Sequence, residues 1–336
     1  MVKASMYASA AIGGEIAMRL RDERMQRFIR LMLLLAVALA SARAAADTYP
    51  SRPIDFIVPW GTGGGADYMG RALARELQPS LGVSLPVLNV PGGTGQTGLV
   101  KMRDGKADGY TIEEVTSETV LLEVTGKPLF KLDEFVCLAI IDQQNPGLLV
   151  RADSAFKGWQ EIVDAAKSRR VSVAFDGYGS SGDLIVNYIN RKLGTKFELV
   201  PYDKPGERVA SVLGGHNDLL FTQPGDVVSY VDGKQLRPVL MFADTKDARF
   251  PDVPASKEVG LDASLIHFRA MYVKAGTDPA IVSKLIEAVD KATMSPGYKA
   301  ALEREAALKN STVSAQEAAK FIDAWLGQAR RIRKAP

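Results

Sequence analysis

Glycine-rich turns between strand-like and helix-like segments constrain this chain most strongly. They are "GTGGGAD" at 61–67, "PGGTGQTG" at 91–98 and "DGYGSSGD" at 176–183, and each follows a strand-like run and opens a helical pattern. In a parallel sheet such turns lie at one edge, outside the carboxyl ends of the strands. Glycines and helix N-termini present backbone N–H groups there, which favour anions. The pattern predicts turns that converge on a small multi-oxygen anion such as a carboxylate.

Strand-like and helix-like segments alternate along the whole chain, which is typical of an α/β fold. For example, residues 54–58 predict a strand and residues 67–78 a helix with one apolar face. Two apolar, extended segments, 145–150 and 266–273, enclose a self-contained α/β stretch. We therefore expect two lobes with mostly parallel sheets, helices on both faces and the ligand in the cleft between them. The expected boundaries are a signal peptide at 1–46, a discontinuous first lobe at 47–148 plus 270–336, and a second lobe at 149–269.

The N-terminal segment has the pattern of a secretory signal peptide. Basic residues precede an apolar run at 31–40, and three alanines at 44–46 end the segment. The alternative is a membrane anchor, but the apolar run is shorter than the roughly 20 residues that a spanning helix needs. We expect cleavage near Asp47 and a periplasmic protein, whose start codon encodes either Met1 or Met25.

The charge balance without this leader is nearly neutral. Seven of the 42 basic and three of the 39 acidic side chains precede residue 47, which leaves 35 and 36. That balance gives no indication of nucleic acid as a partner or of a membrane surface. The single cysteine excludes an intramolecular disulfide, and His216 and His267 lie in contexts that favour structural roles. We expect no metal site and no cofactor.

The sequence partly matches two enzyme motifs, a dinucleotide-binding fingerprint and a serine nucleophile motif, but completes neither. Residues 61–66 match G-x-G-x-x-A, yet the second strand ends in Asn89 and Val90, where a dinucleotide site needs an acidic residue. Ser180 and Ser181 both miss the G-x-S-x-G nucleophile pattern. We therefore expect no catalytic residues, and an exported α/β enzyme acting on a small anion stays open as the alternative.

Four stretches together resemble the tripartite tricarboxylate transporter receptors, the periplasmic Bug-type solute-binding proteins. They are "YPSRPIDFIVPWGTGGGAD", "LNVPGGTGQTG", "ADGYTI" and "LVPYDKPGERVASVLGGHNDLLF". The resemblance runs from about Tyr49 to the C-terminus. It implies a two-lobe periplasmic binding fold that closes on a carboxylate, either a di- or tricarboxylate or an aromatic or amino acid. It also implies delivery to the large and small membrane subunits of a transporter by a receptor that we expect to be monomeric.

The resemblance places the ligand at the first two glycine turns, and the chain's own pattern adds the third. A further segment, "TSETVLL", is expected to be a loop that contributes Ser117, with Glu118 facing outward. If Glu118 faced the cleft instead, it would repel a carboxylate or pair with an ammonium or a protonated acid. The predicted ligand-binding residues are Trp60, Thr62, Gly63, Gly64, Gly65, Asp67, Pro91, Gly92, Gly93, Thr94, Gly95, Thr97, Ser117, Gly179, Ser180 and Ser181.

Overall fold

The computed structural model of the protein describes residues 32, 49–126, 128–202 and 204–335. The predicted signal peptide and its cleavage site near Asp47 lie outside these residues, apart from Met32. The chain divides into Met1–Ser51 and Arg52–Pro336, and all the strands and helices given below belong to the second unit. Within the described ranges, no helix combines the length and apolar character needed to span a membrane.

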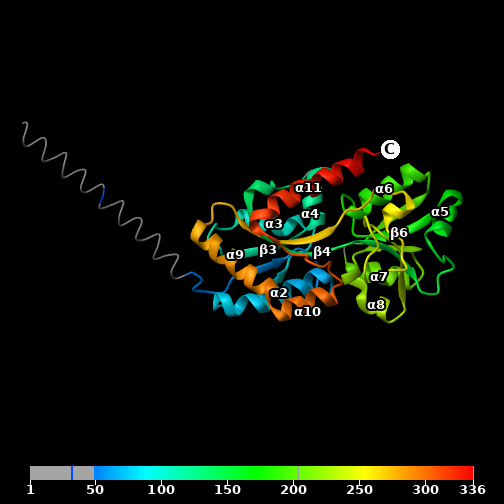
Figure 1. Cartoon of the computed structure of the whole chain (residues 1–336). Coiled ribbons are helices and arrows are strands. Elements are labelled where there is room, and N and C mark those ends of the chain that lie inside the picture. Colours follow the sequence, from blue (N-terminus) through cyan, green and yellow to red (C-terminus); the bar gives the residue numbers. More distant parts are fainter. Residues whose placement is uncertain (1–31, 33–48, 127, 203, 336) are drawn as a thin grey trace, which may run out of the picture. The chain divides into compact units, whose positions relative to one another are not determined.

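The described residues form two β-sheets, each with helices packed on both faces (Figure 1). We call the parts built on them the first and the second lobe. The first sheet has the order β11-β4-β10-β3-β1-β2, and the second has the order β7-β6-β8-β5-β9. The strands of the first are β1 Asp55–Val58, β2 Val87–Asn89, β3 Thr111–Thr116, β4 Phe135–Gln144, β10 His267–Lys274 and β11 Val313–Ser314. Those of the second are β5 Gly147–Arg151, β6 Val171–Phe175, β7 Phe197–Pro201, β8 Leu219–Thr222 and β9 Leu236–Met241.

Both sheets are mixed, so the expectation of mostly parallel sheets is wrong. β1 is parallel to β2 and β3, and β6 is parallel to β7 and β8. By contrast, β10 is antiparallel to β3 and β4, and β5 is antiparallel to β8 and β9. The reason is the crossing between the lobes. β5 and β10 begin where the chain arrives from the other lobe, whereas β3 and β8 end there. The predicted lobe boundaries at 148 and 270 fall inside β5 and β10, and they stay a prediction.

Figure 1 shows α2, α9 and α10 on one face of the first sheet and α3, α4 and α11 on the other. In the second lobe, α7 and α8 lie on one side of β6 and α5 and α6 on the other. The helices of the first lobe are α2 Gly65–Leu81, α3 Gln96–Asp104, α4 Ser117–Thr125, α9 Pro279–Met294, α10 Pro296–Arg304 and α11 Ala315–Lys334. Those of the second are α5 Trp159–Ser168, α6 Ser181–Leu193, α7 Pro205–Leu213 and α8 Val228–Asp232. Single 3₁₀ turns are η1 Leu132–Glu134, η2 Pro224–Val227 and η3 Ser256–Val259.

The helix after the first glycine turn has the buried face that its sequence predicts. Met69, Leu73 and Leu77 of α2 are buried, and Gly82 ends the helix in the left-handed conformation with φ of 70°. The segment "TSETVLL", in contrast, is the helix α4 and not a loop. Its first residue follows β3 without a linker, and nearly all of its residues are buried, so neither a turn signal nor an amphipathic period reveals it.

Candidate functional site

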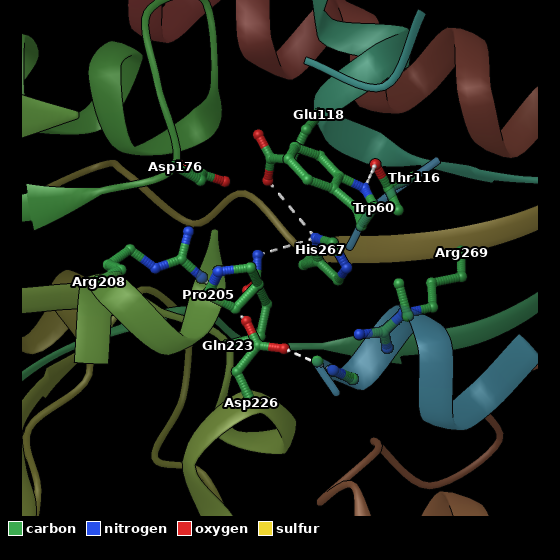
Figure 2. A pocket seen from close by; sticks show the side chains of 13 residues that line it. Trp60, Thr116, Glu118, Asp176, Pro205, Arg208, Gln223, Asp226, His267 and Arg269 are labelled. Carbon is green, nitrogen blue, oxygen red and sulfur yellow. Dashed lines mark hydrogen bonds and ion pairs between the residues drawn. The ribbon is translucent and has the colours of Figure 1, made fainter. Parts of the chain in front are cut away.

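Two adjoining cavities lie between the lobes, at the edge where the glycine turns meet. The larger has about 670 Å³ of space for water-sized molecules, within the usual range for a small-molecule site. The smaller has about 30 Å³ and shares Trp60, Asp176 and Pro205 with the larger (Figure 2). The larger is lined by Trp60, Gly61, Thr62, Pro91, Gly92, Gly93, Thr94, Asp176, Lys204, Pro205, Gly206 and Glu207. The smaller is lined by Trp60, Gly64, Gly65, Ala66, Thr116, Glu118, Asp176, Pro205, Arg208, Gln223, Asp226, His267 and Arg269.

The first two glycine turns form one wall of the larger cavity, as their sequences predict. Residues 92–95 have φ of 131°, 59°, 58° and 84° in succession, and Thr94 adopts this left-handed conformation although it is not a glycine. The backbone N–H groups of Gly61, Thr62, Gly92, Gly93 and Thr94 have no acceptor in the part of the chain that the structure describes. This wall therefore offers several backbone donors to whatever occupies the cavity.

The opposite wall comes from the second lobe and is built on the N-terminus of α7. Pro205 is the first residue of α7, the side chain of the N-cap residue Lys204 does not cap the helix, and Gly206 follows in its first turn. The first N–H groups of a helix lack partners within it and carry partial positive charge, so this end also favours an anion. Lys204 and Glu207 pair at 2.8 Å at the edge of this cavity, where both are exposed.

The third glycine turn lies against the first lobe and does not line either cavity with the residues that were predicted for it. Thr125 donates from its hydroxyl to the carbonyl oxygen of Gly179 at 2.6 Å. Ser180 caps α6 by accepting from the backbone N–H of Asp183. Within this turn it is Asp176, at the end of β6, that reaches both cavities.

Glu118 is buried and faces the second lobe, so the expectation that it points outward is wrong. Its carboxylate accepts from the backbone N–H and the hydroxyl of Ser181, at 2.7 and 2.8 Å. Ser181 is the first residue of α6, where a carboxylate also complements the helix dipole. Because α4 begins directly where β3 ends, Glu118 lies at the edge of the sheet that faces the cleft.

Asp226 makes the reciprocal contact from the second lobe to the first. Its Oδ1 accepts from the backbone N–H of Gly65 at 3.0 Å, at the start of α2, and a dashed line at Asp226 marks this bond in Figure 2. Its Oδ2 lies 3.0 Å from Nη2 of Arg208. Each lobe thus supplies a carboxylate that caps a helix of the other, and both contacts require the cleft to be closed.

A buried, mostly acidic cluster surrounds the smaller cavity. Arg269 on β10 pairs with Asp142 and lies 3.5 Å from an oxygen of Glu114, with all three side chains almost fully buried. His267, on the same strand, has Nδ1 3.0 Å from both the hydroxyl of Ser117 and Nε2 of Gln223. The two arginines that line this cavity are therefore already engaged with carboxylates of the chain.

Burial shifts the pKa values of this cluster. Desolvation raises the pKa of Asp176 to about 7, and the nearby Glu118 carboxylate adds to that shift. Desolvation also raises the pKa of Glu118 above its ordinary value, and it lowers the pKa of His267 to about 3. Burial alone would raise the pKa of Asp226, but the Arg208 and Arg269 guanidiniums hold it below its ordinary value. The imidazole of His267 is therefore neutral at physiological pH, while Asp226 is ionised.

The structure separates the other predicted residues into those at the cavities and those behind them. Trp60, Thr62, Gly64, Gly65, Pro91, Gly92, Gly93 and Thr94 line one or both cavities. Asp67 instead buttresses the first turn by accepting from the N–H of Gly63 at 3.1 Å and from Asn89 at 3.0 Å. Among the described residues, Gly63, Asp67, Gly95, Thr97, Ser117, Gly179, Ser180 and Ser181 are not part of either lining.

Sequence reasoning missed most of the charged lining. Pro205 and Gly206 carried a helix-start signal in the quoted stretch "KPGERV", which could have found the α7 wall. His267 and Arg269 were interpreted as part of an apolar crossing strand, and His267 was expected to be structural. The one available signal was their spacing of two residues, which places the side chains of His267 and Arg269 on the same face of the strand.

Comparison with known proteins agrees with this geometry. Residues 69–335 match the family model described as "Tripartite tricarboxylate transporter family receptor". The "UPF0065 protein in gbd 5'region" of Cupriavidus necator is 32% identical over 300 residues, which cover 86% of this chain and 90% of that protein. The matched family is one of solute-binding receptors and not of enzymes.

Two solved structures share the two-lobe periplasmic binding fold. The periplasmic binding protein BugD is 21% identical, with a TM-score of 0.78 over 85% of this chain and 98% of BugD. MatC of Rhodopseudomonas palustris, solved with bound malate, is also 21% identical, with a TM-score of 0.76 over 85% of this chain and all of MatC. The expected α/β architecture of two lobes is thereby confirmed.

Proposed function

Because this chain belongs to the tripartite tricarboxylate transporter receptor family, we propose that it is a periplasmic receptor that captures a small carboxylate between its lobes. It then delivers the carboxylate to the large and small membrane subunits of a transporter. A solute-binding role follows from the family itself, whereas the ligand class, the delivery, the periplasmic location and the monomeric state are parts of the proposal.

The observation that carries the proposal is the wall of uncommitted backbone donors. The N–H groups of Gly61 and Thr62 and of residues 92–94 line a cavity with room for a small organic acid. Opposite them lies the N-terminus of α7, which the side chain of its N-cap residue Lys204 does not cap. Such donors bind a carboxylate through several hydrogen bonds, and because they are neutral, no charged side chain has to be desolvated to bind it. MatC, which shares the fold, holds a small dicarboxylate.

The capture requires movement of the lobes about the two crossings at 145–150 and 266–273. The caps between lobes, from Glu118 to Ser181 and from Asp226 to Gly65, must break for a solute to enter. Closure about element-terminal hinges is a common mode of ligand binding in two-lobe proteins.

The test begins with protein purified from a native periplasmic extract. After denaturation, mass spectrometry should identify a small acid released unchanged, and calorimetric titration of the stripped protein with that acid should show saturable binding. Small-angle scattering should show a smaller radius of gyration at saturation. A protein that retains residues 31–40 and stays in the membrane fraction, or a radius that does not change on binding, would contradict the corresponding part of the proposal.

A further inference from the structure

Asp176 is a buried carboxylate with an uncommitted oxygen at the junction of the two cavities. It follows the last residue of β6, is 7% exposed, and lines both cavities. Its Oδ1 has no hydrogen-bond partner in the described part of the chain. Figure 2 shows its carboxylate directed from the end of β6 toward the cavity. A buried acceptor without a donor is costly, so this oxygen indicates a place where a donor from a ligand belongs.

Each cationic side chain that lines the cavities lies beside a carboxylate of the chain. Of the described lining residues, Arg208 binds Asp226, Arg269 binds Asp142, and Lys204 binds Glu207. A second carboxylate would therefore meet cations whose charge is already balanced by acids of the chain, although Nε of Arg208 and Nε of Arg269 are buried without a hydrogen-bond acceptor. Beside Asp176 the second carboxylate would also meet Glu118, because both acids line the smaller cavity. A positive group placed there would be attracted by both.

Resting on the proposed function, we propose that the solute carries a positively charged nitrogen in addition to its carboxylate and that Asp176 binds this nitrogen. The glycine turns at 61–62 and 92–94 then hold the carboxylate. Trp60 lines both cavities, and its ring offers the cation a further favourable surface. The class of ligand is thus an amino-bearing acid in place of a simple di- or tricarboxylate.

The protonation of Asp176 gives the binding a characteristic pH dependence. Burial raises its pKa to about 7, so a cation that binds there displaces a proton near neutrality. Affinity for an amino acid therefore rises from pH 6 to pH 8, whereas a second carboxylate would need protonated Asp176 and would bind more weakly as the pH rises. The titratable or charged groups of the surrounding elements are Glu118 on α4, Lys204, Glu207 and Arg208 at the start of α7, Asp226 on η2, and His267 and Arg269 on β10.

The test is calorimetric titration of the full-length mature protein, stripped of co-purified solute, with matched pairs of acids. The pairs are propionate and β-alanine, succinate and aspartate, glutarate and glutamate, and benzoate and 4-(aminomethyl)benzoate. At least one amino-bearing acid should bind about 10- to 150-fold more tightly than its partner, the range expected for a hydrogen bond to a charged group. Asp176→Asn should abolish that preference, with a thermal melt as the folding control. Asp164→Asn makes the same change at an exposed carboxylate of α5 that lines neither cavity, and it should leave the preference intact.

The outcomes separate this inference from the proposed function. If the unsubstituted acids bind as tightly as their amino partners or more tightly, or if affinity for an amino acid falls from pH 6 to pH 8 in the wild-type protein, Asp176 does not select a cation and the inference is overturned. The receptor function would still stand in that case. If no probe binds and denaturation releases no small acid, the proposed function itself fails, and the inference fails with it.

Discussion

Replacement of Glu118 by glutamine tests whether the two lobes are held together by the caps that they exchange. Glu118 is 1% exposed and accepts two hydrogen bonds from Ser181 across the cleft, at 2.7 and 2.8 Å. Glutamine keeps the shape and one acceptor oxygen, but it places an NH₂ group against the second donor. A hydrogen bond to a charged group contributes about 1.5–3 kcal/mol, so the closed state should lose about that much, or roughly 10- to 150-fold in its ratio to the open state.

Amide hydrogen exchange in the ligand-free protein measures this ratio at the contact itself. The Ser181 amide is protected by Glu118 in the closed state, and it should exchange faster in Glu118→Gln by about the same 10- to 150-fold. The Gly65 amide, which Asp226 holds on the other side of the cleft, should also exchange faster, because opening of the lobes breaks both caps together. Glu123→Gln changes an exposed carboxylate of the same helix and should leave both amides unaffected.

Two results of this exchange experiment would contradict a role for Glu118 in holding the lobes together. Unchanged exchange at Ser181 in a normally folded Glu118→Gln protein would show that the cap contributes nothing to closure. Faster exchange at Ser181 alone, with Gly65 unaffected, would mean that Glu118 caps α6 locally and does not help to hold the lobes together.

Two further predictions follow from the site and its surroundings. A Cβ at Gly64 would lie 3.2 Å from Cγ of Pro205 across the cleft, and its φ of −90° suits any residue, so Gly64→Val should obstruct closure without straining the backbone. The affinity of Gly64→Val for the co-purified acid should fall about 5- to 150-fold, because overpacking costs roughly 1–3 kcal/mol. Its melting temperature should stay unchanged, and so should the affinity of the control Gly327→Ala, where an added Cβ meets no atom within 4 Å. Wild-type affinity in Gly64→Val would contradict the assigned cleft. Burial raises the pKa of Glu114 and Glu305 to about 8, so the folded chain keeps protons that the unfolded chain releases above about 4.5. Stability should therefore fall as the pH rises toward 8, and a melting temperature at pH 8.5 equal to or above that at pH 6.5 would contradict this sign.

Local features that depend on short-range chemistry could be predicted from the sequence. Apolar runs, helical periods and cap residues gave the order of most strands and helices, and Met69, Leu73 and Leu77 are buried on the predicted face of α2. The first two glycine turns were predicted to meet, and they do form one wall of a cavity. These predictions succeed because a turn, a cap or an amphipathic face is decided by residues a few positions apart.

The side chains that complete the lining of the cavities depend on long-range packing, and the sequence did not reveal them. Glu118 was expected to face outward, and the third glycine turn was expected to bind the ligand. Instead, the carboxylate of Glu118 accepts hydrogen bonds from the backbone N–H and the hydroxyl of Ser181 in that turn. Asp176, Arg208 and Asp226 reach the cavities from segments whose direction is set by two crossings between the lobes. Those crossings also make β5 and β10 antiparallel to their neighbours, which no local pattern reveals. The residues around a glutamate on a short helix look the same in the sequence whether its carboxylate is exposed to water or bonded to a helix of the opposite lobe. The partner of such a carboxylate is set by tertiary packing and not by its neighbours in the chain.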